Sequence, residues 1–271
     1  MIKDITLGQY FPGNSPLHRL DPRMKIVLMV IYITALFISY TAVSYTFMIA
    51  LTIFLVILSQ ISFKLYLRGL KPLFIIILFT AVLNMFYANG NVLIEWWIFR
   101  ITDGGIANAL RMIFRIMLLV ISTSILTYTT SPVMLTSGLE RLLSPLKIIK
   151  IPVHEFAMMM TIALRFIPTL LEETDKIMSA QKARGVDFES GGIGKKIKAV
   201  VPIIIPLFVS SFRRADELAL AMQCRCYNGD SKNRTRLIQY HLAIRDYIFL
   251  AGSAIAVVAA LLLNHVLIFG F

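Results

Sequence analysis

Charged residues are scarce in this sequence of 271 residues. Asp, Glu, Lys and Arg together make up 15% of it, whereas hydrophobic residues make up 58%. A soluble domain is about one quarter charged and about one half apolar. The shortage of charge therefore excludes an ordinary cytosolic enzyme, and the abundance of apolar residues excludes a disordered chain. The length allows several membrane spans and one segment outside the membrane.

Cysteine is also scarce. The two cysteines, Cys224 and Cys226, are separated by one position. They are too close together for an easy disulfide and too few for a metal cage. We therefore expect reduced thiols on the cytoplasmic side and no metal site.

Motifs of catalysis and nucleotide binding are missing. The string GGIGKK at 191–196 lacks the first glycine and the final Ser or Thr of a phosphate-binding loop. His154-Glu155 begins like a zinc-protease helix, but Met158 stands where the second His is needed. Neither a GxSxG elbow nor the patterns of nucleic-acid binding occur. We therefore expect a chain that is not an enzyme, holds no cofactor and has no nucleic-acid partner.

Five apolar runs are long enough to cross a membrane, because 17 to 23 helical residues reach across roughly 30 Å of hydrocarbon. The predicted spans are 24–40, 43–58, 72–88, 106–128 and 243–269. The sequence thus predicts an all-α membrane protein with about five transmembrane helices. Its segments would be a bundle of four spans at 1–130, an arm at 131–242 and a C-terminal transmembrane helix at 243–271.

Basic residues gather on one side of these spans. The loop between the third and fourth spans holds only Arg100, whereas 131–245 holds 17 Lys and Arg against 10 Asp and Glu. The other basic residues on the same side are Lys3, Arg19, Arg23, Lys64, Arg68 and Lys71. The positive-inside rule then places the N-terminus in the cytoplasm and the C-terminus outside.

The arm contains two further apolar runs, 156–171 with Arg165 near its middle and 199–212 with Pro202 and Pro206. Runs of this length are more often interfacial or buried helices than spans. If the first run crossed, six of the basic residues after it would lie outside, against the charge rule. We therefore expect the arm to stay cytoplasmic. A seven-span chain in which both runs cross stays open, because it leaves the C-terminus on the same side.

Three coupling helices are predicted in the arm. Ser131 caps a short helix at 131–147, and two long helices follow at 153–184 and 195–227. Proline inside a helix bends it, and a glycine cluster between helices forms a joint. The candidate hinge and kink residues are Pro168, Gly191, Gly192, Gly194, Pro202 and Pro206.

The two long helices resemble each other after a shift of 41 residues. The identities are Asp175 with Asp216, Ala180 with Ala221, and Arg184 with Arg225. Each helix ends on an arginine between small residues, Ala183-Arg184-Gly185 and Cys224-Arg225-Cys226. Arginine pairs in bidentate fashion with carboxylates, and small neighbours let a partner approach the backbone. A solvated cation that offsets the helix dipole fits the same pattern.

Two further arginines, Arg111 and Arg115, lie four residues apart on one face of the fourth predicted span. Their side chains could extend to the lipid headgroups. They could equally make a polar contact inside the bundle. The sequence leaves both roles open.

Several of these strings resemble one known family. They are SPLHRLDPRMK at 15–25, Arg165-Phe166-Ile167-Pro168, and the two arginine tips. Together they resemble the transmembrane T component (EcfT/CbiQ-like) of energy-coupling factor (ECF) transporters, which import vitamins and metal ions in prokaryotes. The resemblance covers essentially the whole chain. The second tip departs from the family's usual Ala-Arg-Gly, because it reads Cys-Arg-Cys.

The resemblance implies a mechanism and partners. Two cytoplasmic ABC-type ATPases would bind ATP and Mg, and Arg184 and Arg225 would each dock into one of them. A small membrane subunit, which could be exchangeable, would capture the substrate. The residues implied to contact that subunit are Phe156, Phe166, Ile204 and Phe208. The chain would lie among the lipids of the prokaryotic inner membrane.

Two other classes of function remain open. A stand-alone secondary transporter would need ionisable groups or broken helices within the membrane, in related halves. A membrane scaffold would dock cytosolic proteins without transport.

Overall fold

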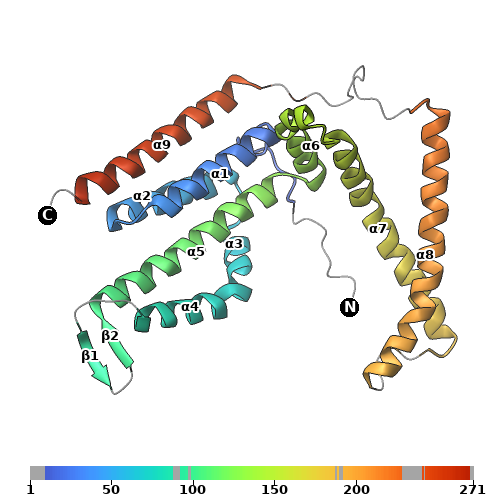
Figure 1. Cartoon of the computed structure of the whole chain (residues 1–271), viewed down its shortest axis with the longest axis horizontal. Coiled ribbons are helices and arrows are strands. Elements are labelled where there is room, and N and C mark those ends of the chain that lie inside the picture. Colours follow the sequence, from blue (N-terminus) through green and yellow to red (C-terminus); the bar gives the residue numbers. More distant parts are fainter. Residues whose placement is uncertain are drawn as a thin grey trace. The chain divides into compact units, whose positions relative to one another are not determined.

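The computed structural model describes residues 10–87, 92–96, 99–186, 188, 192–227, 240 and 242–268. Helices dominate the described residues, and α5, α7 and α8 are the longest (Figure 1). The elements in chain order are α1 (Pro22–Ile38), α2 (Ala42–Ser59), α3 (Phe63–Leu70), the 3-10 helix η1 (Lys71–Leu73), α4 (Phe74–Tyr87), β1 (Val92–Trp96), β2 (Phe99–Thr102), α5 (Asp103–Thr129), α6 (Pro132–Leu142), the 3-10 helix η2 (Ser144–Ile149), α7 (Val153–Ala183), α8 (Ile193–Cys224) and α9 (Ile244–Ile268). The prediction of an all-α membrane protein is confirmed.

The chain divides into two compact units. One unit, which we call the bundle, consists of Gly8–Gly138 and Gln239–Phe271. The other, which we call the arm unit, consists of Leu139–Ile238 together with Met1–Leu7. The helices α1 to α5 and α9 belong to the bundle, whereas η2, α7 and α8 belong to the arm unit.

Four helical segments in the described residues are long and apolar enough to cross a membrane. They are Ala42–Ser59, Phe63–Met85, Asp103–Thr129 and Ile244–Asn264. The remaining predicted span, 24–40, corresponds to α1, which has 17 residues and contacts α5 and α9. Within the described ranges, α1, α7 and α8 are not among the helices that meet this criterion of length and composition.

The third predicted span corresponds to α4, Phe74–Tyr87, but the helical segment that contains it begins earlier, at Phe63. We expected it at residue 72, after a loop that holds three basic residues. Instead α2 ends at Ser59, Gln60 adopts a left-handed conformation at φ 58°, and the chain is helical again from Phe63. The segment from Phe63 is a helix and not a loop because it is amphipathic. It buries Tyr66 and Leu70, and its basic residues lie on the opposite face. The loop between the third and fourth spans also differs, because β1 and β2 pair there as antiparallel strands.

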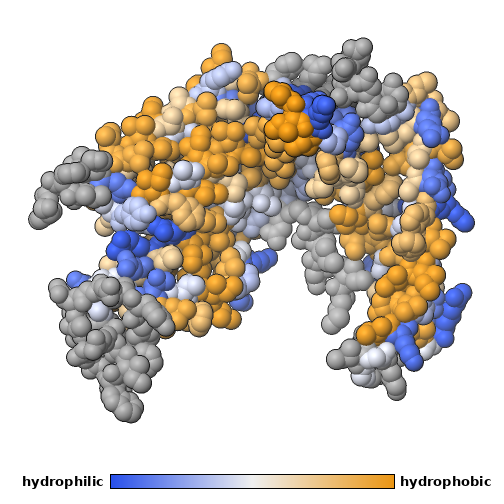
Figure 2. Space-filling view, viewed as in Figure 1, coloured by the Kyte–Doolittle hydropathy of each residue, from blue (hydrophilic) through white to orange (hydrophobic). Residues whose placement is uncertain are grey.

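The core of the bundle consists of two clusters of buried side chains. One is formed by Leu17, Leu20, Val56, Tyr66, Ile125 and Tyr128, and the other by Tyr32, Ala35, Leu36, Tyr45, Met48 and Leu118. The outer surface of the same helices is also apolar, with Ile57 of α2 69% exposed (Figure 2). An apolar surface of this extent would aggregate in water, whereas it suits the hydrocarbon of a bilayer.

A single amide fastens α9 to two other helices of the bundle. The Asn264 Oδ1 atom accepts hydrogen bonds from the backbone N–H groups of Tyr40, at 3.1 Å, and Thr41, at 3.2 Å. Its Nδ2 atom donates to the Ile38 carbonyl at 2.6 Å. These bonds satisfy backbone groups at the end of α1 and the start of α2, which their own helices leave unpaired.

Candidate functional site

The first arginine tip ends α7 in a defined turn. Gly185 has φ +87°, its N–H donates to the Lys182 carbonyl at 3.0 Å, and the Val186 N–H donates to the Gln181 carbonyl at 3.0 Å. This pair of bonds is the Schellman motif, which satisfies the last carbonyls of a helix. Arg184 is therefore the C-cap residue of α7. The predicted helix end is confirmed.

The second tip ends α8 in the same motif. The Cys226 N–H donates to the Gln223 carbonyl at 2.8 Å, and the Tyr227 N–H donates to the Met222 carbonyl at 3.0 Å. Arg225 is the C-cap residue, as Arg184 is in α7. Cys226 takes the place of the glycine with φ +57°. The motif ends α8 at Cys224, three residues before the predicted end.

Both tips are open to their surroundings. The six predicted docking residues are all exposed: Ala183, Arg184, Gly185, Cys224, Arg225 and Cys226. A Cβ atom added to Gly185 would meet nothing within 4 Å, so the positive φ is what favours glycine there. Among the described residues, none accepts a hydrogen bond from the guanidinium of Arg184 or Arg225.

The helices α7 and α8 contact each other and run in opposite directions (Figure 1). One ion pair joins them, because the Arg214 Nη2 atom donates to the Glu173 Oε2 atom at 2.6 Å. Their side chains are 34% and 26% exposed, respectively. We did not predict this pair.

The four residues implied to contact a substrate-binding subunit lie before the crossing of α7 and α8, in the halves that contain the prolines. Phe156, Ile204 and Phe208 are exposed, and Phe166 is half-buried. Phe208 also stacks against Phe212, with 4.6 Å between the ring centroids. Figure 2 shows apolar surface along this half of α8.

The hinge and kink candidates fall in three settings. Pro168 lies inside α7, and Pro202 and Pro206 lie inside α8. Gly192 is the N-cap residue of α8, and Gly194 lies in its first turn rather than in the connecting segment. Gly191 lies outside the described residues.

The N-terminal string at 15–25 has a structural role inside the bundle. Asp21 caps α1 by accepting from the Arg23 N–H at 2.9 Å, and its own N–H donates to the Asp246 Oδ1 atom at 3.0 Å. The second oxygen of Asp246 accepts from the Ala243 N–H at 2.8 Å. Both carboxylates are buried. The string therefore ties the start of α1 to the start of α9.

Lys25 extends this network to α5. Its Nζ atom donates to the Thr129 carbonyl at 2.9 Å, to the Thr130 Oγ1 atom at 3.1 Å and to the His18 carbonyl at 3.2 Å. All three ammonium protons therefore have acceptors, so the hydrogen-bonding capacity of the buried cation is satisfied. We name the group of Asp21, Arg23, Lys25 and Asp246 the charge network.

Arg111 and Arg115 have different roles. The Arg115 Nε atom donates to the Tyr45 hydroxyl at 3.0 Å, and its guanidinium lies 5.5 Å from the centre of the Phe37 ring. The Arg111 Nε atom donates to the Ala107 carbonyl of its own helix. Arg115 thus makes the polar contact inside the bundle, and Arg111 does not share it.

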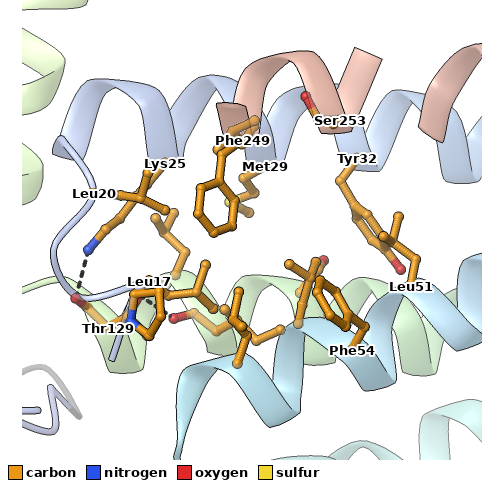
Figure 3. A pocket seen from close by; sticks show the side chains of 18 of the residues that line it. Leu17, Leu20, Lys25, Met29, Tyr32, Leu51, Phe54, Thr129, Phe249 and Ser253 are labelled. Atoms are coloured by element: carbon orange, nitrogen blue, oxygen red, sulfur yellow. Dashed lines mark hydrogen bonds between the residues drawn. The ribbon is translucent and has the colours of Figure 1, made fainter. Parts of the chain in front are cut away.

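A cavity of about 490 Å³ lies among α1, α2, α5 and α9 (Figure 3). Apolar side chains such as Met29, Phe54 and Phe249 line it, and Lys25 stands at one end with its bond to Thr129. None of the described residues that line the cavity is acidic. The cavity therefore offers a poor site for the ion coupling that a secondary transporter needs.

The apolar helices define a membrane component that carries two exposed arginine tips. Comparison with known proteins identifies the family. Residues 13–237 match the family model CbiQ, described as cobalt transport protein. The chain therefore belongs to the CbiQ family and is the transmembrane component of an ECF transporter.

Similar proteins carry the description "energy-coupling factor transporter transmembrane protein EcfT". The chain is 52% identical over 250 residues to one from Clostridium kluyveri, which covers 92% of both chains. It is 48% identical over 266 residues to one from Ruminiclostridium cellulolyticum, covering 98% of this chain and 99% of the relative. A relative from Lactococcus lactis is 43% identical over 266 residues, covering 98% and 100%. The resemblance noted from the sequence is confirmed.

Proposed function

We propose that this chain couples ATP hydrolysis by two cytoplasmic ABC-type ATPases to the movement of a small substrate-binding membrane subunit. The observation that carries the proposal is the equivalence of the two tips. Arg184 and Arg225 occupy the same C-cap position of the same turn, at the ends of helices with nearly the same length. Two equivalent tips suit two equivalent partners.

The turn prepares each arginine for docking. The Schellman bonds already occupy the last carbonyls of the helix, so a partner needs only to accept the guanidinium. Small exposed neighbours let a groove of the partner close around the backbone. A groove that presents carboxylates or carbonyl oxygens would bind the planar guanidinium in bidentate fashion.

The other end of the mechanism would be the exposed apolar surface of α7 and α8, formed by Phe156, Phe166, Ile204 and Phe208. A membrane subunit that binds a vitamin or a metal ion would pack against it. When the ATPases close on ATP, the tips would move with them and the subunit would reorient in the bilayer. ATP and Mg would stay on the ATPases. The N-terminus would be cytoplasmic and the C-terminus outside.

Charge reversal at the tips tests the docking. The chain would be co-expressed with its two ATPases, and the ATPase-to-chain ratio measured after purification in detergent. We expect Arg184→Glu or Arg225→Glu to lower the ratio from two to about one, and the double variant to lose both ATPases. Breaking a buried charged contact costs about 2–5 kcal/mol, or roughly 30-fold or more in affinity.

Lys182→Glu is the matched control, because Lys182 is an exposed cation two residues from Arg184. It should leave the ratio at two. Full capture of both ATPases by the double arginine variant would overturn the docking proposal.

A further inference from the structure

The ion pair between α7 and α8 joins equivalent positions of the two helices. Glu173 and Arg214 are 41 residues apart, which is the same separation as that of Arg184 and Arg225. The helices have 31 and 32 residues. The pair therefore divides both helices at the same point, at about two thirds of their length.

Equal lengths of helix lead from the pair to the tips. Arg184 follows Glu173 by eleven positions, and Arg225 follows Arg214 by eleven positions. Eleven helical residues rise about 16 Å and make about three turns, so each tip lies on nearly the same helix face as its member of the pair. Because the helices run in opposite directions, the two tips lie on opposite sides of the crossing (Figure 1).

The charges at the crossing are complementary although the helices are otherwise alike. Glu172 and Glu173 on α7 stand where Arg213 and Arg214 stand on α8. Two copies of either helix would place like charges together, which disfavours contact. Of these four residues, Glu173 and Arg214 are half-buried, and Glu172 and Arg213 are exposed.

We propose that Glu173 and Arg214 are positioning residues that fix the register of α7 on α8. They would act as a pivot with two arms of equal length, so that a given rotation moves both tips by the same distance. A slip of one helix by one turn would shift one tip by about 5.4 Å and make the arms unequal. The value of equal arms for transport rests on the proposed docking of the tips, whereas the register itself does not.

The register can be measured in the full-length chain without partners. Spin labels would be placed at Ala183→Cys and at the native Cys224, which are equivalent positions, in a Cys226→Ser background. We expect one narrow distance distribution in lipid nanodiscs. Glu173→Arg should broaden it or shift it by about 5 Å, and the exchange Glu173→Arg with Arg214→Glu should restore it.

Glu172→Arg is the matched control, because Glu172 is the exposed neighbour of Glu173. It should leave the distance distribution unchanged. An unchanged distribution in Glu173→Arg, or no restoration by the exchange, would overturn the pivot. Restoration by the exchange also shows that Glu173→Arg acts by breaking the ion pair, because a chain that fails to fold for another reason would not be restored.

A second readout tests the pivot in the assembled transporter. Glu173→Arg should lower substrate uptake per ATP hydrolysed by roughly fivefold while two ATPases still co-purify, and the exchange should restore it. Unchanged coupling in Glu173→Arg would overturn the role in transport. If Arg184→Glu and Arg225→Glu fail to release the ATPases, the docking proposal is wrong. The spin-label distance between positions 183 and 224 still tests the pivot in that case.

Discussion

Arginines near helix ends occur in both units, but their surroundings differ. In the bundle, Arg23 belongs to the charge network, with its Nη2 atom donating to the Tyr240 carbonyl at 3.2 Å and its Nε atom 3.7 Å from Asp21. In the arm unit, Arg184 and Arg225 are exposed, and no described residue accepts a hydrogen bond from their guanidinium groups. Both regions stood out in the sequence as motifs. Burial and internal partners separate a motif that holds the fold from one that is available to other proteins.

The largest effect should come from breaking the charge network. Asp246→Ala would leave the buried N–H group of Asp21 and the N–H group of Ala243 without their acceptor and would remove a counter-charge of Lys25. We expect the free energy of unfolding to fall by about 3–5 kcal/mol, measured by denaturant titration in detergent micelles. Glu217→Ala, an exposed carboxylate on α8, should change it by less than about 0.5 kcal/mol. Equal free energies of unfolding for Asp246→Ala and Glu217→Ala would contradict this contrast between the bundle and the arm unit.

An intermediate effect should appear at the turns that end α7 and α8. Gly185→Ala puts a Cβ atom on a residue with positive φ, whereas Cys226→Gly removes one, so the two changes should have opposite signs. Each should alter the local opening free energy by about 1 kcal/mol, or roughly fivefold in amide hydrogen exchange. The reporters are the N–H groups of Val186 and Tyr227. Faster exchange at Tyr227 in Cys226→Gly would contradict this account of the turn.

The smallest effect on stability should come from the arginines of the tips. Arg184→Ala and Arg225→Ala remove side chains that have no described partner within the chain. We expect the free energy of unfolding to change by less than about 0.5 kcal/mol, while capture of the ATPases is lost. For each variant, denaturant titration in detergent micelles measures the free energy of unfolding, and the ATPase-to-chain ratio after purification measures capture. A destabilisation as large as that of Asp246→Ala would place the tips with the structural motifs instead.

Local patterns predicted what depends on neighbours in the sequence. The start of α2 and the bounds of α9 lie within one or two residues of the predicted spans, because long apolar runs define them. The predicted cap of α6 is also confirmed, because the Ser131 hydroxyl accepts from the Met134 N–H at 3.3 Å, although α6 ends at Leu142 and not at 147. The helix α3 before the third span was missed, because its basic residues hid its amphipathic period.

Contacts between distant residues were harder to predict. Asp246 lies 225 residues after its partner Asp21, and no local pattern indicates such a pairing. The left-handed conformation of Cys226 was missed as well, because residues other than glycine seldom adopt it. A signal for the Glu173–Arg214 pair did exist, since the 41-residue shift that matches the tips places two acidic residues on two basic ones.

The attachment of α9 has a consequence for how the chain is built during synthesis. Asp246 and Asn264 fasten this helix near both of its ends, yet it leaves the ribosome only after η2, α7 and α8. Until α9 has been synthesised, the buried backbone N–H of Asp21 has no acceptor. The bundle therefore cannot complete its folding before the coupling helices have been synthesised. In the sequence, those helices are consequently an insertion between two parts of the bundle.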